Sequence, residues 1–313
     1  MQRLEQNAYR TVPPNLFDPL PSEEKQADGW IRPSASYWQD VWMRFTRNKT
    51  ALFGLVFIGL MALFAIFGPL FSPYPYDGMD MLSGNQPPNS VHWFGTDKFG
   101  RDIFTRVMYG ARISLTVGVF AAMINLLIGV VYGSVSGYFG GRVDMVMMRI
   151  VDILIGLPSL LYIVLLMLVL GSNLVSVIIA LCITSWIGTA RVVRGQVLSI
   201  KHNEYVLAAM LAGATNRYIL FRHLLPNSMG PIIVSTAFLI PSAIFSEAFL
   251  SFLGIGINVP MASWGTLANE AIPMLQSRPY QMLFPVAAIS LTMFSLNFIG
   301  DGLRDSLDPR LKK

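Results

Sequence analysis

Charged residues are scarce in this sequence. Asp, Glu, Lys and Arg make up 13% of its 313 residues, against about 25% in a typical soluble domain. Apolar residues make up 53%, and the mean hydropathy is +0.52. One globular core of this chain length is too small to bury so much apolar surface, so we expect much of it to face lipid. The scarcity of charge therefore excludes an ordinary cytosolic enzyme and a disordered chain.

The sequence also lacks residues that several kinds of site require. Cys182 is its single cysteine, which excludes a disulfide framework and a cysteine-based metal site. It has no Gly-x-x-x-x-Gly-Lys-Ser/Thr phosphate loop and no His-Glu-x-x-His zinc motif, and no histidine falls within a long apolar run. We therefore expect no catalytic residues and no metal site in this chain. The net charge of +5 comes from scattered residues, which favours lipid headgroups over nucleic acid as the anionic partner.

Six apolar runs are long enough to cross about 30 Å of hydrocarbon as helices. They cover residues 51–72, 113–136, 150–170, 174–190, 230–256 and 283–300. Asp152 and Glu247 are the only Asp, Glu, Lys, Arg or His residues within them, as the cost of burying charge in lipid requires. The sequence thus predicts an all-α integral membrane protein with six transmembrane helices.

Lys and Arg are distributed unequally among the segments that join these runs. With the N-terminus inside, 18 of the 23 fall in inner segments and 5 in outer segments. Because positive charge is enriched on the cytoplasmic side of membrane proteins, we expect both termini in the cytoplasm. The expected organisation is a cytoplasmic tail (1–50), a first transmembrane helix (51–72), an extracytoplasmic loop (73–112) and a core transmembrane domain (113–313) that contains the inner loop 191–229.

The inner loop 191–229 is too long to be a simple turn, and loops of this length usually carry function. Asn203 is placed to cap a short helix, and Gly213 supplies its C-terminal stop. Either residue of Thr215-Asn216 can cap a second short helix, which we expect to end before Pro226. Large apolar side chains on a segment that stays in the cytoplasm indicate a surface for a protein partner.

In the same loop, three residues separate Ala208-Ala209 from Gly213, and eleven separate Gly213 from Leu225-Pro226. This spacing resembles the EAA loop of binding-protein-dependent, ATP-driven importers. Further segments resemble the peptide and nickel branch of that family: Glu204-Tyr205-Val206, Gly213-Ala214, Arg222 to Asn227, Gly95-Thr96-Asp97 to Gly100-Arg101-Asp102, Gly110 to Leu115, Leu250 to Gly254, Ser263-Trp264-Gly265 and Asp301 to Asp305. The resemblance covers nearly everything from Phe94 to Arg310, and it is to the C-type permeases of oligopeptide or dipeptide importers. The chain departs from the general signature at Leu207, where the family has a Glu; here the acid is displaced to Glu204.

The resemblance implies a type I ABC importer permease fold in a bacterial or archaeal plasma membrane. It also implies that the EAA loop forms a coupling helix that rests in a groove of a cytoplasmic ATPase subunit. By this resemblance, the residues expected to couple the chain to the ATPase are Glu204, Tyr205, Ala208, Ala209, Gly213 and Pro226.

The implied partners are a second permease of the B type, two ATP-binding cassette ATPase subunits and an extracytoplasmic substrate-binding protein, in addition to membrane lipid. ATP and Mg would be bound by the ATPase subunits, and no cofactor is expected on this chain. The implied substrate is an oligopeptide, with a dipeptide or a nickel chelate as the alternative.

Ser242, Ser246 and Glu247 are candidates for the translocation path, because they are polar residues within the fifth apolar run, near Pro241. An acid in the bilayer usually faces protein or water. Glu247 therefore either lines the path or makes a structural bond to a neighbouring helix or to the partner permease, and the structural bond is favoured.

Three other features have structural interpretations. Trp264 is expected to anchor an outer loop at the membrane surface. Glycines at every fourth position over 129–137 are expected to allow close helix packing. Asp152 is expected to pair with Arg149, three residues earlier on the same helix face.

Two functions of other classes compete with the importer. A self-contained channel or secondary carrier would transport without an ATPase, through a path lined with intramembrane polar groups, which the sequence provides poorly. A membrane scaffold or sensor would use residues 204–226 to bind a signalling protein.

Overall fold

The computed structural model describes residues 36–183 and 185–308, and its regular elements are helices. They are α1 Tyr37–Arg47, α2 Lys49–Phe71, α3 Ile103–Phe139, α4 Gly141–Gly156, α5 Ser159–Leu170, α6 Leu174–Cys182, α7 Trp186–Ile200, α8 Glu204–Leu211, α9 Asn216–Ile219, α10 Leu225–Phe252, α11 Trp264–Ala271 and α12 Tyr280–Leu307. The larger of the chain's two compact units begins at Trp42 and contains α2 to α12. Within the described ranges the expected all-α class is confirmed, whereas residues 1–35 of the expected tail lie outside them.

Five helical segments of the described chain are long and apolar enough to cross a membrane. They are Lys49–Phe71, Ile103–Phe139, Leu174–Ile200, Asn216–Phe252 and Tyr280–Leu307. A sixth span is present only if α4 and α5, which bend by 83° at their junction, count as one. The expected span over 150–170 is thus not a single straight helix.

Leu157 and Pro158 cause this break. A residue before proline is disfavoured in the helical region, and Leu157 is extended at φ −98° and ψ 135°. Proline also has no N–H to continue the helical hydrogen bonds. A hydropathy scan cannot detect the bend, because both residues are apolar.

The second long helix, α3, begins ten residues earlier than the expected span at 113. Asp102 caps it, because its side chain accepts a hydrogen bond from the backbone N–H of Thr105 at 2.7 Å. The expected extracytoplasmic loop, 73–112, included Arg106 and Arg112. Both side chains instead find acceptors inside the protein, so the segment 103–112 is helical.

Arg112 joins α3 to α2 at a position prepared by Pro69. Pro69 lies inside α2 and has no N–H, so the carbonyl of Ala65 loses its usual helical donor. The Arg112 Nε donates to that carbonyl at 3.1 Å, and its Nη2 donates to the carbonyl of Ile66 at 3.1 Å. The guanidinium therefore satisfies a backbone group that the proline leaves without a partner.

The glycines over 129–137 let α3 and α7 approach closely. A Cβ added at Gly129 would lie 2.6 Å from the Cβ of Thr189, and one at Gly133 would collide with the carbonyl oxygen of Ala190. At Gly137 the carbonyl oxygen of Arg194 would lie at 2.9 Å. The predicted packing role of these glycines is confirmed.

Two further glycines, one in α3 and one in α12, allow these helices to pack closely against the middle of α10. A Cβ at Gly118 of α3 would lie 2.6 Å from Ile244, and a Cβ at Gly300 of α12 would lie 2.9 Å from the ring of Phe238. The segment from Phe238 to Ile244 is therefore closely packed against both α3 and α12.

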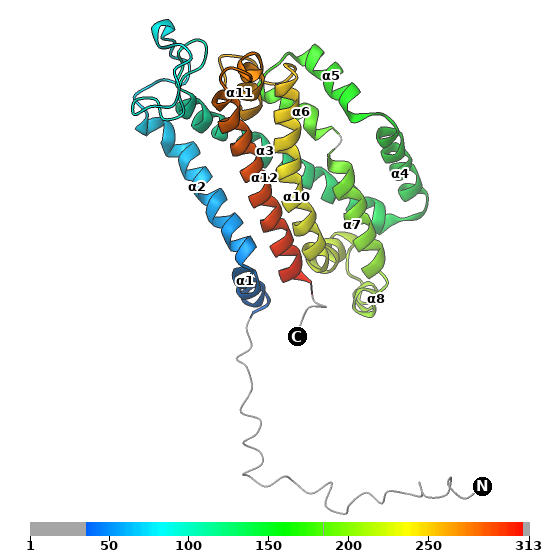
Figure 1. Ribbon diagram of the computed structural model, residues 1–313. Helices are drawn as coiled ribbons and strands as arrows, with labels where there is room; N and C mark the ends of the chain where they lie inside the picture. Colours follow the sequence, from blue (N-terminus) through cyan, green and yellow to red (C-terminus); the bar gives the residue numbers. More distant parts are fainter. Residues whose placement is uncertain (1–35, 184, 309–313) are drawn as a thin grey trace, which may run out of the picture. The chain divides into compact units, whose positions relative to one another are not determined.

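Within the larger unit, α8 lies at one end of α7 and α10, and α11 lies at the opposite end (Figure 1). Trp264, at the start of α11, is fully buried, and its indole Nε1 donates to the carbonyl of Val107 at 3.0 Å. The predicted position at the membrane surface is therefore wrong, because the indole N–H finds its acceptor inside the helix bundle.

Candidate coupling segment and intramembrane residues

The first part of the candidate coupling segment, residues 204–226, is α8. Asn203 is extended, and its carbonyl accepts from the N–H of Val206 at 2.9 Å, but its side chain makes no capping bond. Gly213 adopts φ +81°, and the N–H of Ala214 then donates to the carbonyl of Ala209 at 3.0 Å. The predicted stop at Gly213 is confirmed, because glycine enters this left-handed conformation without steric cost.

The second part does not end where the sequence indicated. Thr215 caps α9 through a hydrogen bond from the N–H of Tyr218 at 3.3 Å. A π-helical turn over Leu220–Leu224 then leads into α10, so one helix runs from Asn216 to Phe252. The prediction that this helix ends before Pro226 is wrong. Pro226 lies in the first turn of α10, directly after the widened turn, where a missing N–H is tolerated.

The coupling segment is fixed to the bundle by three buried apolar side chains. Val206, Ile219 and Leu224 pack in one cluster with Val193 and Val197 of α7. Tyr138, near the end of α3, also donates through its hydroxyl to Asn216 Oδ1 at 2.8 Å. Displacement of α8 must therefore involve the ends of α3, α7 and α10.

The other predicted coupling residues lie mostly at the surface. Glu204, Tyr205, Ala208, Gly213 and Pro226 are exposed, and Ala209 is half-buried. Large apolar side chains surround them: Leu207 is 43% exposed, Phe221 is 66% exposed and Leu211 is 91% exposed. Such a surface is typical of a protein-binding site.

The three intramembrane candidates are not in equivalent environments. Ser242 is exposed and donates to the carbonyl of Phe238 at 2.9 Å, within its own helix. Ser246 is half-buried, whereas Glu247 is fully buried. Glu247 accepts hydrogen bonds from the hydroxyls of Ser114 and Ser251, both at 2.9 Å. Its carboxylate thus links α10 to α3.

Two acidic residues pair with α7. The Asp152 carboxylate lies 2.8 Å from Arg191 in an exposed ion pair, so the expected Arg149 partner is wrong. Sequence reasoning missed Asp144, which accepts from Arg194 Nε and Nη2 at 2.5 and 2.6 Å and from the Ser136 hydroxyl at 2.5 Å. A partner 50 residues away gives no local signal in the sequence.

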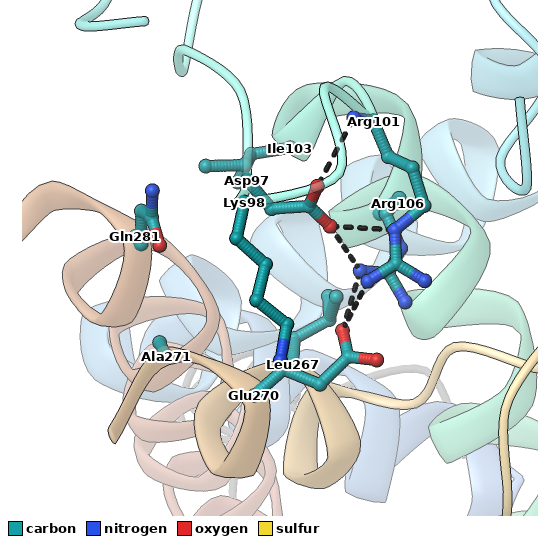
Figure 2. Close-up of a pocket in the computed structure, with 9 residues that line it drawn as sticks. All are labelled: Asp97, Lys98, Arg101, Ile103, Arg106, Leu267, Glu270, Ala271 and Gln281. Atoms are coloured by element: carbon teal, nitrogen blue, oxygen red, sulfur yellow. Dashed lines mark hydrogen bonds and ion pairs between the residues drawn. The ribbon is translucent and has the colours of Figure 1, made fainter. Parts of the chain in front are cut away.

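At the opposite end of the bundle, the Gly95 to Arg106 segment builds a buried charge cluster (Figure 2). One oxygen of Asp97 accepts from Arg101 Nε at 2.6 Å and from Arg106 Nη1 at 2.8 Å. Glu270 of α11 accepts from the same two guanidinium groups, at 2.9 and 2.5 Å. Sequence reasoning missed Glu270, which lies 164 residues from Arg106.

A left-handed backbone conformation and a close backbone contact explain why residue 100 is a glycine. Gly100 adopts φ +73°, and a Cβ there would collide with the carbonyl oxygen of Asp80. The Asp80 side chain accepts from the Ser83 hydroxyl at 2.6 Å and from the N–H of Leu82 at 3.1 Å, and these bonds hold the pKa of its carboxyl below the usual value. The segment from 80 to 100 is therefore a defined structure.

The histidines do not gather into a metal site. His92 Nδ1 lies 2.9 Å from Asp102 Oδ1. The described residues contain no group of three or more His, Cys, Asp or Glu side chains that could hold a metal ion.

Comparison with known proteins places this arrangement among transport proteins. The family described as "binding-protein-dependent transport system inner membrane component" matches residues 129–313. The family described as "N-terminal TM domain of oligopeptide transport permease C" matches residues 36–88.

Individual relatives match almost the whole chain. The oligopeptide transport system permease protein OppC of Bacillus subtilis (strain 168) is 50% identical over 304 residues, covering 97% of this chain and 100% of that protein. The dipeptide transport system permease protein DppC of the same organism is 50% identical over 306 residues, covering 97% and 96%. OppC of Escherichia coli (strain K12) is 43% identical over 291 residues, covering 92% and 95%.

Proposed function

This chain belongs to the family of binding-protein-dependent transport system inner membrane components, and from that membership we propose that it is the C-type permease subunit of an ATP-driven oligopeptide importer in a bacterial plasma membrane. In this complex the chain forms half of the translocation pathway and is not itself an enzyme. The other half is a B-type permease, and an extracytoplasmic substrate-binding protein delivers the peptide. Two cytoplasmic ATPase subunits bind ATP and Mg.

The exposed apolar surface of α8 is the observation that carries this proposal. Tyr205, Leu207 and Leu211 are exposed, while their neighbour Val206 is fully buried in the bundle. A short helix that is anchored on one side and apolar on the other fits a groove on a partner protein. In the proposed complex that partner is an ATPase subunit.

The continuous helix from Asn216 to Phe252 supports a route for coupling. When the ATPase subunits close on ATP, α8 moves with them, and this helix carries the movement into the membrane. Outward-open and inward-open states then alternate because ATP binds one of them more tightly.

Ser242 and Ser246 are assigned to the wall of the pathway because neither is fully buried in the chain. Glu247 is assigned a neighbouring role. Its bonds to Ser114 and Ser251 support a structural link between α3 and α10 beside the pathway.

The proposed topology has six spans, with α4 and α5 together forming the third, and both termini in the cytoplasm. The same unequal distribution of Lys and Arg supports this orientation. Reporter cysteines test it, because Cys182 is the single native cysteine and is buried. In a Cys182→Ser background, cysteines at Leu82 and Leu211 should react with an impermeant maleimide from opposite sides of the membrane. Labelling of both from the same side would contradict this topology.

Substitution of α8 tests the function directly. Leu211→Asp places a charge on the 91% exposed side chain of α8, and Leu82→Asp is the matched control, because Leu82 is 97% exposed in the distant outer loop. Purification of the tagged chain from its native membrane should recover a second permease and P-loop ATPases with the unsubstituted chain and with Leu82→Asp. Leu211→Asp should lose the ATPases and peptide uptake together.

Two results would contradict the proposal. If the purified chain transported peptide with no ATPase attached, a self-contained carrier would replace it. If deletion of the gene left uptake intact and residues 204–226 captured a signalling protein, a membrane scaffold would replace it.

Peptide length is tested separately. Relatives named for oligopeptide and for dipeptide transport are both 50% identical to this chain. Uptake of a labelled pentapeptide should be competed by other pentapeptides and not by dipeptides or a nickel chelate. Competition by dipeptides alone would move the assignment to a dipeptide importer.

A further inference from the structure

Arg106 in the outer charge cluster has hydrogen-bonding capacity that no protein group uses. Its side chain is 1% exposed, and its Nη1 donates to both Asp97 and Glu270. Its Nε and Nη2 are buried, and no group in the described chain accepts from either of them. These two nitrogens form one edge of the guanidinium, with parallel N–H bonds, the arrangement by which arginine binds anions. The buried Arg106 thus has two parallel N–H donors available for a bound ion or water molecule.

A small cavity adjoins this arginine. Its volume is about 20 Å³, and Arg106, Lys98 and Glu270 are among the residues that line it (Figure 2). A site of about this size holds one water molecule or one ion of similar radius. It is too small for phosphate, sulfate or a free peptide.

The charges around the cavity do not balance. Lys98, Arg101 and Arg106 carry three positive charges, and Asp97 and Glu270 carry two negative charges. Asp97 and Glu270 neutralise the two buried guanidinium groups, so the excess positive charge is that of the exposed Lys98. This net positive charge attracts an anion to the free edge of Arg106, whereas water would only satisfy its donors.

We propose that this cavity, between the Gly95 to Arg106 segment and α11, is a binding site for a single halide-sized monovalent anion. The side edge of Arg106 binds the anion, and Lys98 provides a further positive charge at the more open side. The anion completes the contact between the outer loop and α11, at the end of the bundle remote from α8 (Figure 1). This site is independent of the substrate and of the ATPase partners.

Lys98 allows a test that leaves the buried cluster intact. It lines the cavity and is exposed, and its ammonium lies over the Phe99 ring at 4.8 Å, whereas the cluster's ion pairs are made by Arg101 and Arg106. Lys98→Gln should therefore weaken anion binding without unfolding the loop. Lys49→Gln is the control, because Lys49 is an exposed lysine at the start of α2.

The experiment measures thermal unfolding of the full-length chain, purified with the subunits that accompany it, in sodium gluconate, chloride or bromide at constant ionic strength. Saturating chloride or bromide should raise the unfolding midpoint by about 3 °C over gluconate. Lys98→Gln should raise the half-saturating halide concentration at least threefold and leave the midpoint in gluconate unchanged. Lys49→Gln should behave like the unsubstituted chain.

Anomalous diffraction from bromide-grown crystals locates the ion independently. A bromide peak within 3.6 Å of Arg106 Nε and Nη2 supports the site. Equal midpoints in all three salts, halide stabilisation that Lys98→Gln leaves unchanged, or density at this position without an anomalous signal would each overturn it. The last result would identify a structural water.

Discussion

Asp144 and Arg194 form a two-point contact between the first turn of α4 and the middle of α7. Nε and Nη2 of Arg194 each donate to a different oxygen of the Asp144 carboxylate, at 2.5 and 2.6 Å. The Arg194 side chain is 32% exposed and that of Asp144 is 17% exposed. This pair joins the start of α4 to α7.

Asp144→Asn should lower the free energy of unfolding by about 1–3 kcal/mol, because it leaves a half-buried guanidinium without its charged partner. A detergent-based unfolding titration measures the loss. Asp152→Asn is the control: its exposed pair with Arg191 should contribute less than about 1 kcal/mol. Equal losses in the two variants would contradict a special role for the Asp144 pair.

Gly133→Ala should force α3 away from α7, because the new methyl group would collide with the carbonyl oxygen of Ala190. We expect a loss of about 1–3 kcal/mol in the free energy of unfolding. Gly59→Ala in α2 should be neutral or stabilising, since nothing lies within 4 Å of an added Cβ there. A neutral Gly133→Ala would mean that the two helices are not in close contact.

The contribution of the Arg112 guanidinium to stability should depend on Pro69. Arg112→Leu should destabilise the protein by about 1–3 kcal/mol, since it leaves the carbonyl of Ala65 without a donor. In a Pro69→Ala background residue 69 regains its N–H, so the same substitution should be less harmful. A double-mutant cycle measures this coupling, and purely additive effects would exclude it.

Gly213→Ala should impair coupling more than folding. The φ of +81° is unfavourable for any side chain, so the substitution should distort the end of α8 at a strain of about 1 kcal/mol. Peptide uptake should fall severalfold while membrane levels of the chain remain normal. Gly195→Ala is the control, because an added Cβ meets nothing within 4 Å at that helical position. Unchanged uptake with Gly213→Ala would exclude a tight requirement at this turn.

Local and periodic signals in the sequence predicted much of this structure. The helix stop at Gly213 follows from a backbone preference of a single residue. The close approach of α3 and α7 follows from glycines spaced one helical turn apart over 129–137. Both properties can be read without knowledge of distant parts of the chain.

Two errors arose where a distant partner changes what a residue does. Arg106 suggested an outer loop, but Glu270 and Asp97 make its burial in α3 possible. Trp264 suggested the membrane surface, but its acceptor is the carbonyl of Val107. The error at Pro226 has a local cause: a π-helical turn precedes this proline, and the helix continues through it.

In the coupling proposed above, the helix from Asn216 to Phe252 acts as a lever with unequal arms. Its fulcrum is the stretch from Phe238 to Ile244, which Gly300 and Gly118 hold from two sides. The arm toward α8 is about 33 Å long and the arm toward α11 is about 12 Å long, at 1.5 Å per residue. A rigid swing about this fulcrum moves the two ends in opposite directions, with roughly one third of the travel at the α11 end. In the proposed importer, opening at one side of the membrane and closing at the other would then be the same motion, and the side near α11 would need only a small displacement.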